Sequence, residues 1–168
     1  MNLIQLYLYD FTAFKEWDVQ EDGRFADHQL DGCWTTDDRH PFLIYANGKL
    51  AGFAIVDGRS HLTGAHGIWA VRDFFVLRRF QKRGVGEHVA RVLFDRFRGC
   101  WEVCQMAANL GAQAFWRKVI NRYTDGQFEE AQWNDARWRG PVQSFDNGLR
   151  LIIPASENAK TSPHEPNC

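Results

Sequence analysis

The sequence predicts a single soluble domain of mixed α/β class, in which helices cover both faces of one sheet. Its 168 residues are 45% hydrophobic and 24% charged, which is the size and composition of one globular domain with a substantial core. Segments with helical spacing of apolar residues alternate with strand-like runs through the middle of the chain. We assign residues 1–153 to this domain and expect residues 154–168, which are polar and contain proline, to be a disordered tail.

The first part of the chain predicts a helix followed by a hairpin. Residues 2–15 carry apolar side chains at the i, i+3, i+4 spacing of one helical face, although apolar residues also alternate there, which leaves a strand as the alternative. Residues 16–40 are polar and irregular, which predicts a long loop with a short second helix. The β-rich runs 41–46 and 49–56 flank Asn47-Gly48, the dipeptide that favours a type I′ hairpin turn.

The second part predicts, in order, a long strand at residues 68–77, a basic loop at 78–86, a helix that ends near Gly99, a strand at 101–107 and a short helix at 112–120. Residues 123–153 are strand-rich, with turns expected at Asn134-Asp135, Gly140-Pro141 and Asn147-Gly148. This order of elements favours a mixed sheet between two layers of helices.

Charge and composition exclude several classes of protein. The 20 Lys and Arg residues are balanced by 21 Asp and Glu, so the chain lacks the basic excess of a general nucleic-acid binder. No apolar run reaches the roughly 18–20 residues of a membrane span, and we expect a cytoplasmic protein without membrane contact. The cysteines are too few and too scattered for a disulfide scaffold or a zinc site, so we expect reduced thiols and no metal; they are Cys33, Cys100, Cys104 and Cys168.

The basic turn after the predicted strand at 68–77 has the most chemical content. Lys82 and Arg83 lie beside a helix N-terminus, whose unpaired N–H groups favour an anion. Gly84 and Gly86 let a ligand approach the backbone without meeting a Cβ. The turn has neither the Gly-Lys-Ser/Thr ending of a P-loop nor the spacing of a Rossmann turn. It predicts either a pyrophosphate site or simply a tight basic turn.

Two motifs in sequence order favour the first alternative. Gln81, Gly84 and Gly86 match the pattern Q/R-x-x-G-x-G/A, and residues 109–118 are similar to N-x-x-A-x-x-F-Y-x-K. Both patterns belong to the GNAT superfamily of N-acetyltransferases, which the chain resembles best over residues 40–123. The resemblance implies a mainly antiparallel twisted sheet whose central strands splay apart, and acetyl-CoA as the acetyl donor.

The resemblance also implies where acetyl-CoA would lie. Its pyrophosphate would contact the amides of residues 81–86, and its pantetheine arm would pair with the backbone of Phe75 and Leu77 between the splayed strands. An N–H near Leu77 would polarise the thioester carbonyl, and Trp116 would pack on the arm. The implied cofactor-binding residues are Phe75, Val76, Leu77, Gln81, Lys82, Arg83, Gly84, Val85, Gly86, Asn109, Ala112, Phe115 and Trp116.

The chain departs from the family pattern in two places. Trp116 stands where the family has a tyrosine that is credited with protonating the leaving thiolate, and an indole N–H is no acid near neutral pH. Tyr123 is a candidate substitute. The family's opening strand has no counterpart before the predicted first helix, which leaves a sheet edge to be covered. Together with the apolar run at residues 149–153, this edge predicts a homodimer.

Local charge points to the second substrate. Residues 10–38 hold nine acidic and two basic residues, whereas residues 72–98 hold eight basic and three acidic ones. The basic segment suits an anionic cofactor. In the family the segment after the first helix shapes the acceptor pocket, so its acidity suggests a cationic amine such as a polyamine, an amino sugar or a basic side chain. A solvated acidic loop is the alternative.

Transfer to an amine needs a base, and two carboxylates are candidates. Asp73 shares a strand face with Phe75 and Leu77 by the two-residue period, and Glu102 lies near the start of the adjacent strand. Either carboxylate could instead face solvent or pair with an arginine such as Arg72. The tryptophan pairs Trp17 with Trp34 and Trp133 with Trp138 are candidates for pocket walls.

The predicted function is direct transfer of acetyl from acetyl-CoA to a small-molecule or side-chain amine in a ternary complex, with Asp73 or Glu102 as base and the Leu77 N–H as oxyanion donor. The alternative is a non-catalytic acyl-CoA-binding or protein-interaction module that has lost the chemistry, which the replacement of tyrosine by Trp116 favours.

Overall fold

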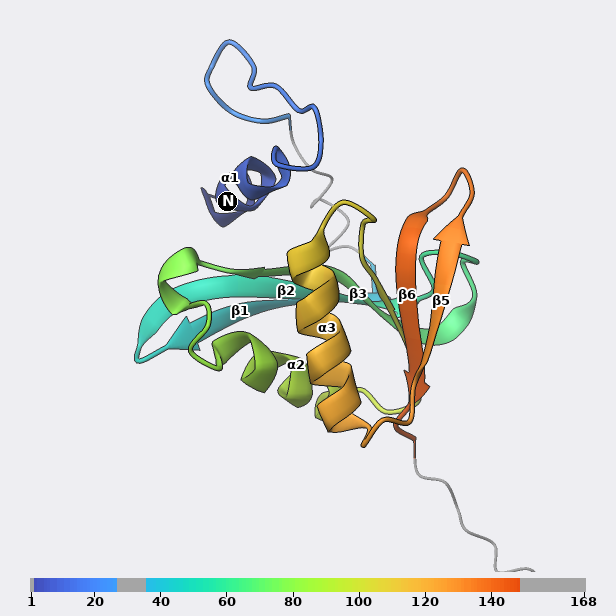
Figure 1. The fold of residues 1–168 in the computed structure, drawn as a ribbon. Coiled ribbons are helices and arrows are strands. Elements are labelled where there is room, and N and C mark those ends of the chain that lie inside the picture. Colours follow the sequence, from blue (N-terminus) through green and yellow to red (C-terminus); the bar gives the residue numbers. More distant parts are fainter. Residues whose placement is uncertain (1, 27–35, 149–168) are drawn as a thin grey trace, which may run out of the picture.

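The structure, a computed structural model, describes residues 2–26 and 36–148 (Figure 1). The elements of this part of the chain are α1 (Asn2–Phe11), β1 (Arg39–Ala46), β2 (Lys49–Arg59), β3 (His66–Val76), a 3₁₀ turn (Arg78–Phe80), α2 (Val85–Arg96), β4 (Cys100–Cys104), α3 (Leu110–Tyr123), β5 (Glu129–Asn134) and β6 (Arg139–Asp146). The predicted tail, the apolar run at 149–153, Trp34, Cys33 and Cys168 lie outside the described residues.

The strands form one six-stranded sheet in the order β1-β2-β3-β4-β6-β5. β3 and β4 run parallel, and the other neighbouring pairs are antiparallel. Figure 1 shows α2 and α3 in front of the sheet, whereas α1 lies away from them. The predicted mixed, mainly antiparallel sheet with helices on both faces is confirmed.

The two faces of the sheet carry separate hydrophobic cores, as the two-residue period of strands requires. Ala54 and Val56 of β2 pack with residues of α2 and α3. Their neighbours Phe53 and Ile55 pack with Leu3, Ile4, Tyr7 and Leu8 of α1. The helix alternative for the first segment is therefore the right one, because one stripe of α1 covers the apolar side chains of β2 and β3.

The two central strands separate after a short paired region. Pairing of β3 with β4 runs only from Ile68 opposite Cys100 to Ala70 opposite Glu102, although β3 continues to Val76. The register with β2 passes from Val56 opposite Val71 to Ile55 opposite Asp73, so the residue between them on β3, Arg72, is a bulge. The expected splay is confirmed, and it leaves one side of β3 without a strand partner in the described sheet beyond Ala70.

Two turn predictions had opposite outcomes. Asn47 and Gly48 both have positive φ, 51° and 71°, as a type I′ hairpin requires. Gly140-Pro141 lies within β6 and is not a turn, so that prediction is wrong. The glycine is needed there because a Cβ at Gly140 would lie 2.1 Å from the carbonyl oxygen of Gln105.

Two other elements differ from prediction. β4 ends at Cys104, where residues 101–107 were expected to be strand, and α3 extends to Tyr123. Within residues 16–26, the described part of the predicted long loop, there is no helix. A membrane-spanning helix is absent from the described residues as well, because none of their helices is long and apolar enough.

Candidate functional site

The loop between β3 and α2 presents backbone N–H groups to open space. Lys82 has φ of 56° and Gly84 has φ of 81°, so the chain turns sharply just before α2 begins at Val85. No side chain caps this helix, and its first N–H groups have no partner within the helix. A Cβ placed on Gly84 would meet nothing within 4 Å. This geometry suits an anion, and a positive φ at a non-glycine residue such as Lys82 is typical of functional loops.

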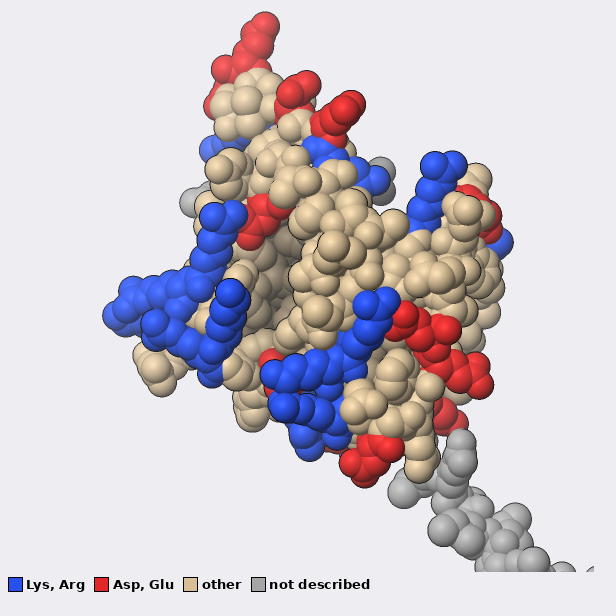
Figure 2. Space-filling model, viewed as in Figure 1, with Lys and Arg blue, Asp and Glu red and all other residues tan. Residues whose placement is uncertain are grey.

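The side chains of the loop divide into charged and structural groups. Lys82 and Arg83 are exposed, whereas Arg78 forms an ion pair with Asp10 of α1 at 2.7 Å. Figure 2 shows basic side chains gathered over this loop, at the left, beside a hollow in the surface. Gln81 uses its side-chain amide to donate to the carbonyl of Val76 at 2.7 Å, so it holds the loop against the end of β3.

The second motif builds the start of α3 and its contact with the loop. The side chain of Asn109 caps the helix by accepting from the N–H of Ala112 at 2.9 Å. A Cβ on Gly86 would lie 3.2 Å from the ring of Phe115, so the glycine lets this ring of α3 pack closely against the first turn of α2. The two motifs thus meet in space.

The backbone of β3 that faces the splay differs from the expectation. The N–H of Leu77 donates to the carbonyl of Ala51 at 2.8 Å and therefore points toward β2. Hydrogen-bonding direction alternates along an antiparallel strand, so Phe75 also faces β2, whereas the N–H groups of Phe74 and Val76 point toward the opening. The prediction that Phe75 and Leu77 pair with the cofactor and that the Leu77 N–H polarises the thioester is wrong. The N–H groups at this part of the strand that lack a partner on β2 are those of Phe74 and Val76.

Asp73 lies on the α1 side of β3, on the same face as Phe75, as predicted. Its carboxylate is 4% exposed and accepts a hydrogen bond from the hydroxyl of Tyr7 at 2.8 Å. Nε of Arg72 lies 3.4 Å from the other carboxylate oxygen, so the pairing with Arg72 that the sequence left open is present. Burial, followed by the charge of Asp73, raises the pKa of Tyr7 well above its usual value.

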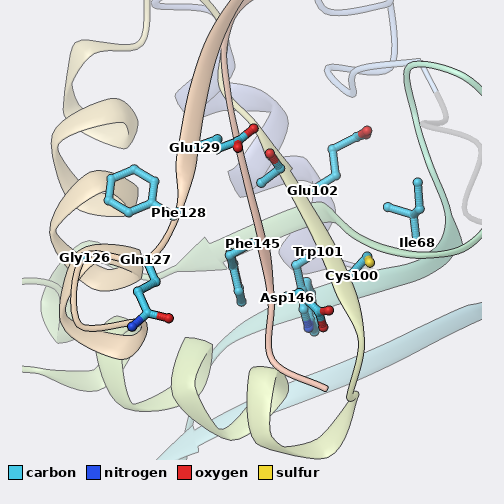
Figure 3. Close-up of a pocket in the computed structure, with 11 residues that line it drawn as sticks. Ile68, Cys100, Trp101, Glu102, Gly126, Gln127, Phe128, Glu129, Phe145 and Asp146 are labelled. Atoms are coloured by element: carbon cyan, nitrogen blue, oxygen red, sulfur yellow. The ribbon is translucent and has the colours of Figure 1, made fainter. Parts of the chain in front are cut away.

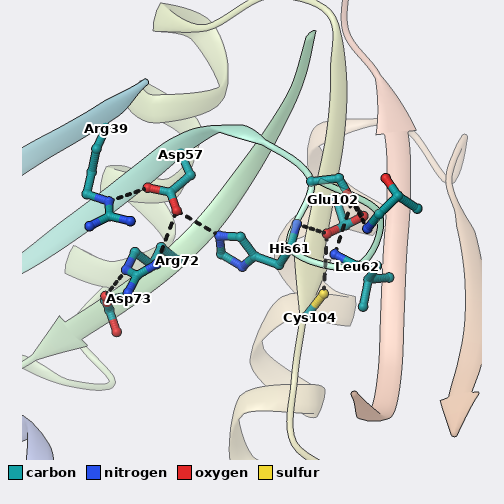
Figure 4. A network of polar contacts seen from close by, with 10 residues as sticks. Arg39, Asp57, His61, Leu62, Arg72, Asp73, Glu102 and Cys104 are labelled. Atoms are coloured by element: carbon teal, nitrogen blue, oxygen red, sulfur yellow. Dashed lines mark hydrogen bonds and ion pairs between the residues drawn. The ribbon is translucent and has the colours of Figure 1, made fainter. Parts of the chain in front are cut away.

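The contacts of Asp73 continue into a larger polar network (Figure 4). Nη1 of Arg72 is 3.4 Å from Asp57, which also contacts Nε of Arg39 at 3.1 Å and Nε2 of His61 at 3.0 Å. Burial acts to raise the pKa of Asp57, but the hydrogen bond from His61 and the nearby positive charges outweigh it, and the pKa is lowered. Two carboxylates and two guanidinium groups therefore alternate along the α1 face of the sheet.

Sequence reasoning missed Tyr7, Asp57 and His61. A charged residue inside an apolar strand such as β2 was a usable signal for Asp57, because an ionised group is buried only with partners. No local sequence pattern pointed to the Tyr7 hydroxyl, because the Tyr7 ring belongs to the apolar stripe of α1.

Glu102 lies at the paired end of β3 and β4, opposite Ala70. Its carboxylate is 8% exposed and accepts from the hydroxyl of Ser60 at 2.8 Å and from the N–H of His61 at 3.0 Å. Glu102 therefore holds the β2–β3 connection to the sheet. The structure does not bring it to the splayed region where Asp73 lies.

The tryptophan that stands where the family pattern has a tyrosine is part of the core. Trp116 is 5% exposed, and its ring is 5.0 Å from that of Phe74, edge to face. The hydroxyl of Tyr123, the candidate substitute, is engaged elsewhere. It donates to Asp95 at 2.9 Å, and Tyr123 follows Phe115 by about 12 Å along α3.

Of the four tryptophans predicted as pocket walls, Trp34 lies outside the described residues, so only the other three can be placed. The guanidinium of Arg137 lies 5.4 Å from the ring centroid of Trp133, and Arg137 also donates to the carbonyl of Leu62 at 2.8 Å. The β5–β6 hairpin is thereby tied to the β2–β3 connection. Trp17 stacks on Phe11 at 6.1 Å, so it extends the aromatic surface at the end of α1.

A cavity of about 520 Å³ lies elsewhere, between β4, β6 and residues 126–129 (Figure 3). Glu102, Glu129 and Asp146 line it. It adjoins Ile68, at the opposite end of β3 from the basic loop, and none of the predicted cofactor-binding residues contributes to it. We therefore place the candidate site at the splay and not in this cavity.

A splayed sheet that opens beside a loop with open N–H groups suits a phosphate-bearing cofactor with an extended amide arm. The model of the acetyltransferase (GNAT) family matches residues 3–120, more than half of the chain. The chain belongs to the acetyltransferase (GNAT) family. It is an N-acetyltransferase, with acetyl-CoA as its co-substrate.

Solved structures agree on the fold. The ribosomal-protein-S18-alanine N-acetyltransferase of Escherichia coli is 17% identical, with a TM-score of 0.53 over 82% of this chain and 84% of that chain. A GNAT-family acetyltransferase of Staphylococcus aureus Mu50 is 12% identical, with a TM-score of 0.50 over 85% and 91% of the two chains. A search of curated proteins finds no match.

Proposed function

We propose that the protein transfers acetyl directly from acetyl-CoA to a primary amine while both substrates are bound. The observation that carries this proposal is the junction of the loop with the splay, where open N–H groups at Lys82 to Gly86 adjoin the outward N–H groups of Phe74 and Val76. The loop, with Lys82 and Arg83, would hold the pyrophosphate. Phe74 and Val76 would pair with the pantetheine arm and polarise the thioester carbonyl.

The chemical step is nucleophilic attack by the amine on the thioester carbonyl carbon. A carbon–nitrogen bond forms, the carbon–sulfur bond breaks, and CoA leaves as a thiolate. A thiol with a pKa near 8.5 is a fair leaving group without a positioned acid, which makes Trp116 compatible with activity. The cysteine at the end of β4 does not favour a covalent intermediate, because burial and then Glu102 raise the pKa of Cys104 and keep it a thiol.

Asp73 is the base in this proposal, and Glu102 is not. Asp73 directly precedes Phe74, whose N–H faces the opening, and its carboxylate is on the face away from α2 and α3, so it would lie beside a carbonyl bound by that N–H. Glu102 is bonded to Ser60 and His61 at the closed end of the splay. The proton lost by the amine would pass to Asp73, directly or through one water.

A cationic acceptor is supported by the segment that follows α1. Glu16, Asp18, Glu21 and Asp22 are all exposed there, and Figure 2 shows acidic side chains at the top of the molecule, over this segment. α1 carries the segment on the face of the sheet where Asp73 lies. Asp38, in contrast, forms an ion pair with Arg59, so we do not include it among the carboxylates that would attract the amine.

Thiol release from acetyl-CoA with a panel of polyamines, amino sugars, basic peptides and neutral amines tests the proposal. We expect turnover with at least one cationic amine and an acetylated product by mass spectrometry. Calorimetric binding of acetyl-CoA without thiol release for any amine would favour the non-catalytic module instead.

We also propose that the protein is a homodimer through the β1 edge. β1 is an outer strand of the described sheet, and Leu43, Tyr45 and Leu50 of its hairpin are 50%, 62% and 39% exposed. A second β1 edge would satisfy the open backbone groups and cover these side chains. Light scattering should give twice 19.5 kDa, and Leu43→Lys with Tyr45→Lys should give the monomer. A monomer at all concentrations contradicts the dimer.

The cytoplasmic location stays a prediction.

A further inference from the structure

The proposed base depends on a tyrosine from the other end of the domain. Tyr7 precedes Asp73 by 66 positions, and its hydroxyl donates to Oδ1 of Asp73 at 2.8 Å. The Tyr7 ring lies 5.5 Å from that of Phe53 and 5.9 Å from that of Phe75, so apolar packing fixes where the hydroxyl points. Both partners are buried, with 7% of Tyr7 and 4% of Asp73 exposed.

A carboxyl group buried at this depth needs protein partners in place of water. Arg72 supplies positive charge, but its guanidinium lies 3.4 Å from Asp57 as well as 3.4 Å from Asp73. Arg72 is therefore shared between two carboxylates. The hydrogen bond from Tyr7 is shorter than either of these contacts, so Tyr7 is the donor that fixes the orientation of the Asp73 carboxylate.

We propose that Tyr7 is a positioning residue for acetyl transfer, whose hydroxyl holds the Asp73 carboxylate oriented to receive the amine proton. This inference rests on the proposed role of Asp73 as the base. The raised pKa of Tyr7, caused by burial and by Asp73, keeps the hydroxyl protonated and hence a donor. The network behind Asp73 balances its charge, whereas the hydrogen bond from Tyr7 orients its carboxylate.

The test compares Tyr7→Phe with Tyr9→Phe. Tyr7→Phe removes one hydroxyl and keeps the ring packing, and Tyr9 is a tyrosine of the same helix that is 60% exposed. A hydrogen bond to a charged group supports a loss in kcat of about 10- to 100-fold for Tyr7→Phe. KM for the amine and the affinity for acetyl-CoA should stay within about twofold, because Tyr7 contacts neither substrate. Tyr9→Phe should match the wild type.

The pH profile separates positioning from a structural role. The kcat profiles of Tyr7→Phe and of the wild type should differ in shape on the acidic side, because the variant lacks a donor to the proposed base. The charged and titratable groups around Asp73 are Tyr7 from α1, Arg72 from β3 and, one contact further, Asp57, Arg39 and His61. All but Tyr7 are present in both proteins, so the difference between the profiles reports Tyr7.

A double variant completes the test. In an Asp73→Asn background, Tyr7→Phe should change kcat by less than about twofold, because the hydroxyl then has no carboxylate to hold. Equal losses of kcat in both backgrounds would overturn the inference. So would a folded Tyr7→Phe protein whose kcat and pH profile match those of the wild type. If Tyr7→Phe does not fold, the double variant, which removes the buried charge, supplies the comparison with Asp73→Asn. Wild-type kcat in Asp73→Asn alone would instead remove the proposed base, and this inference with it.

Discussion

The two sides of the opening between β3 and β4 are built in different ways. On the side of α2 and α3, one continuous stretch from Val76 to Gly86 supplies backbone donors and exposed positive charge. On the side of α1, the polar groups come from α1, β1, β2, β3 and the β2–β3 connection, and they meet as a chain of contacts that ends at Tyr7.

This difference shows which half of the site depends on long-range packing. Backbone N–H groups at a helix start are present in any sequence that can make the turn. The side of α2 and α3, where we propose that acetyl-CoA binds and which we call the cofactor side, therefore needs few particular side chains. The α1 side is a network of buried side chains, in which the loss of one partner leaves another group unsatisfied. Substitutions on the side of α2 and α3 should therefore act by blocking the ligand sterically. Substitutions on the α1 side should act by removing a charge or a hydrogen bond.

The largest expected effect is on the α1 side. Asp73→Asn should lower kcat by about 10²- to 10⁴-fold, the usual value of a positioned base, while acetyl-CoA affinity is retained. Glu102→Gln is the matched control, because that carboxylate is buried on the same face but bonded to Ser60 and His61. Glu102→Gln should lower the melting temperature, and its loss of kcat should be smaller than that of Asp73→Asn. Steady-state kinetics that show the reverse order would assign the base to Glu102.

The next effect is on the cofactor side. Gly84→Leu should reduce acetyl-CoA affinity by more than about tenfold, because the side chain would fill the space in front of the open N–H groups. The positive φ at Gly84 adds a folding cost of about 1–2 kcal/mol. Gly64→Leu, at a glycine with φ of 74° and open surroundings, has the same backbone strain and is the control. Isothermal calorimetry with equal affinities in the two variants contradicts the loop assignment.

A smaller effect is expected from the acidic segment. Changing Glu16, Asp18, Glu21 and Asp22 together to their amides should raise KM for a cationic amine several-fold with little change in kcat, because distant carboxylates attract ground and transition states alike. The dependence of kcat/KM on salt should weaken in the same variant, since surface charges act over about 8 Å at physiological ionic strength. A neutral amine is the control. Unchanged KM and salt dependence would make the segment a solvated surface.

The smallest effect concerns stability and Asp57. Its pKa in the folded protein is lowered from 3.8, so its contribution to stability is fully present above the unfolded value and is lost as pH falls through the folded value. The difference in the free energy of unfolding between wild type and Asp57→Asn should therefore shrink below about pH 3.8. Urea unfolding between about pH 6 and pH 3 measures it. A difference that stays constant contradicts the assignment.

Much of the cofactor side was predicted from local sequence. The hairpin at Asn47-Gly48, the basic turn before α2 and the capped start of α3 each depend on residues within a few positions of one another. Turn chemistry, helix capping and hydrophobic periodicity act over such distances, so the sequence by itself specified these elements and their order.

Tertiary structure alone decided the rest. Strand period two predicts that alternate N–H groups of β3 share a side, but only pairing with β2 decides that Phe74 and Val76, and not Phe75 and Leu77, face the opening. Asp73 was a candidate by its strand face, yet its donor Tyr7 is 66 positions away. Glu102 was an equal candidate until Ser60 was found to hold it. Which buried polar groups meet depends on how distant elements pack, and no local pattern in the chain records that.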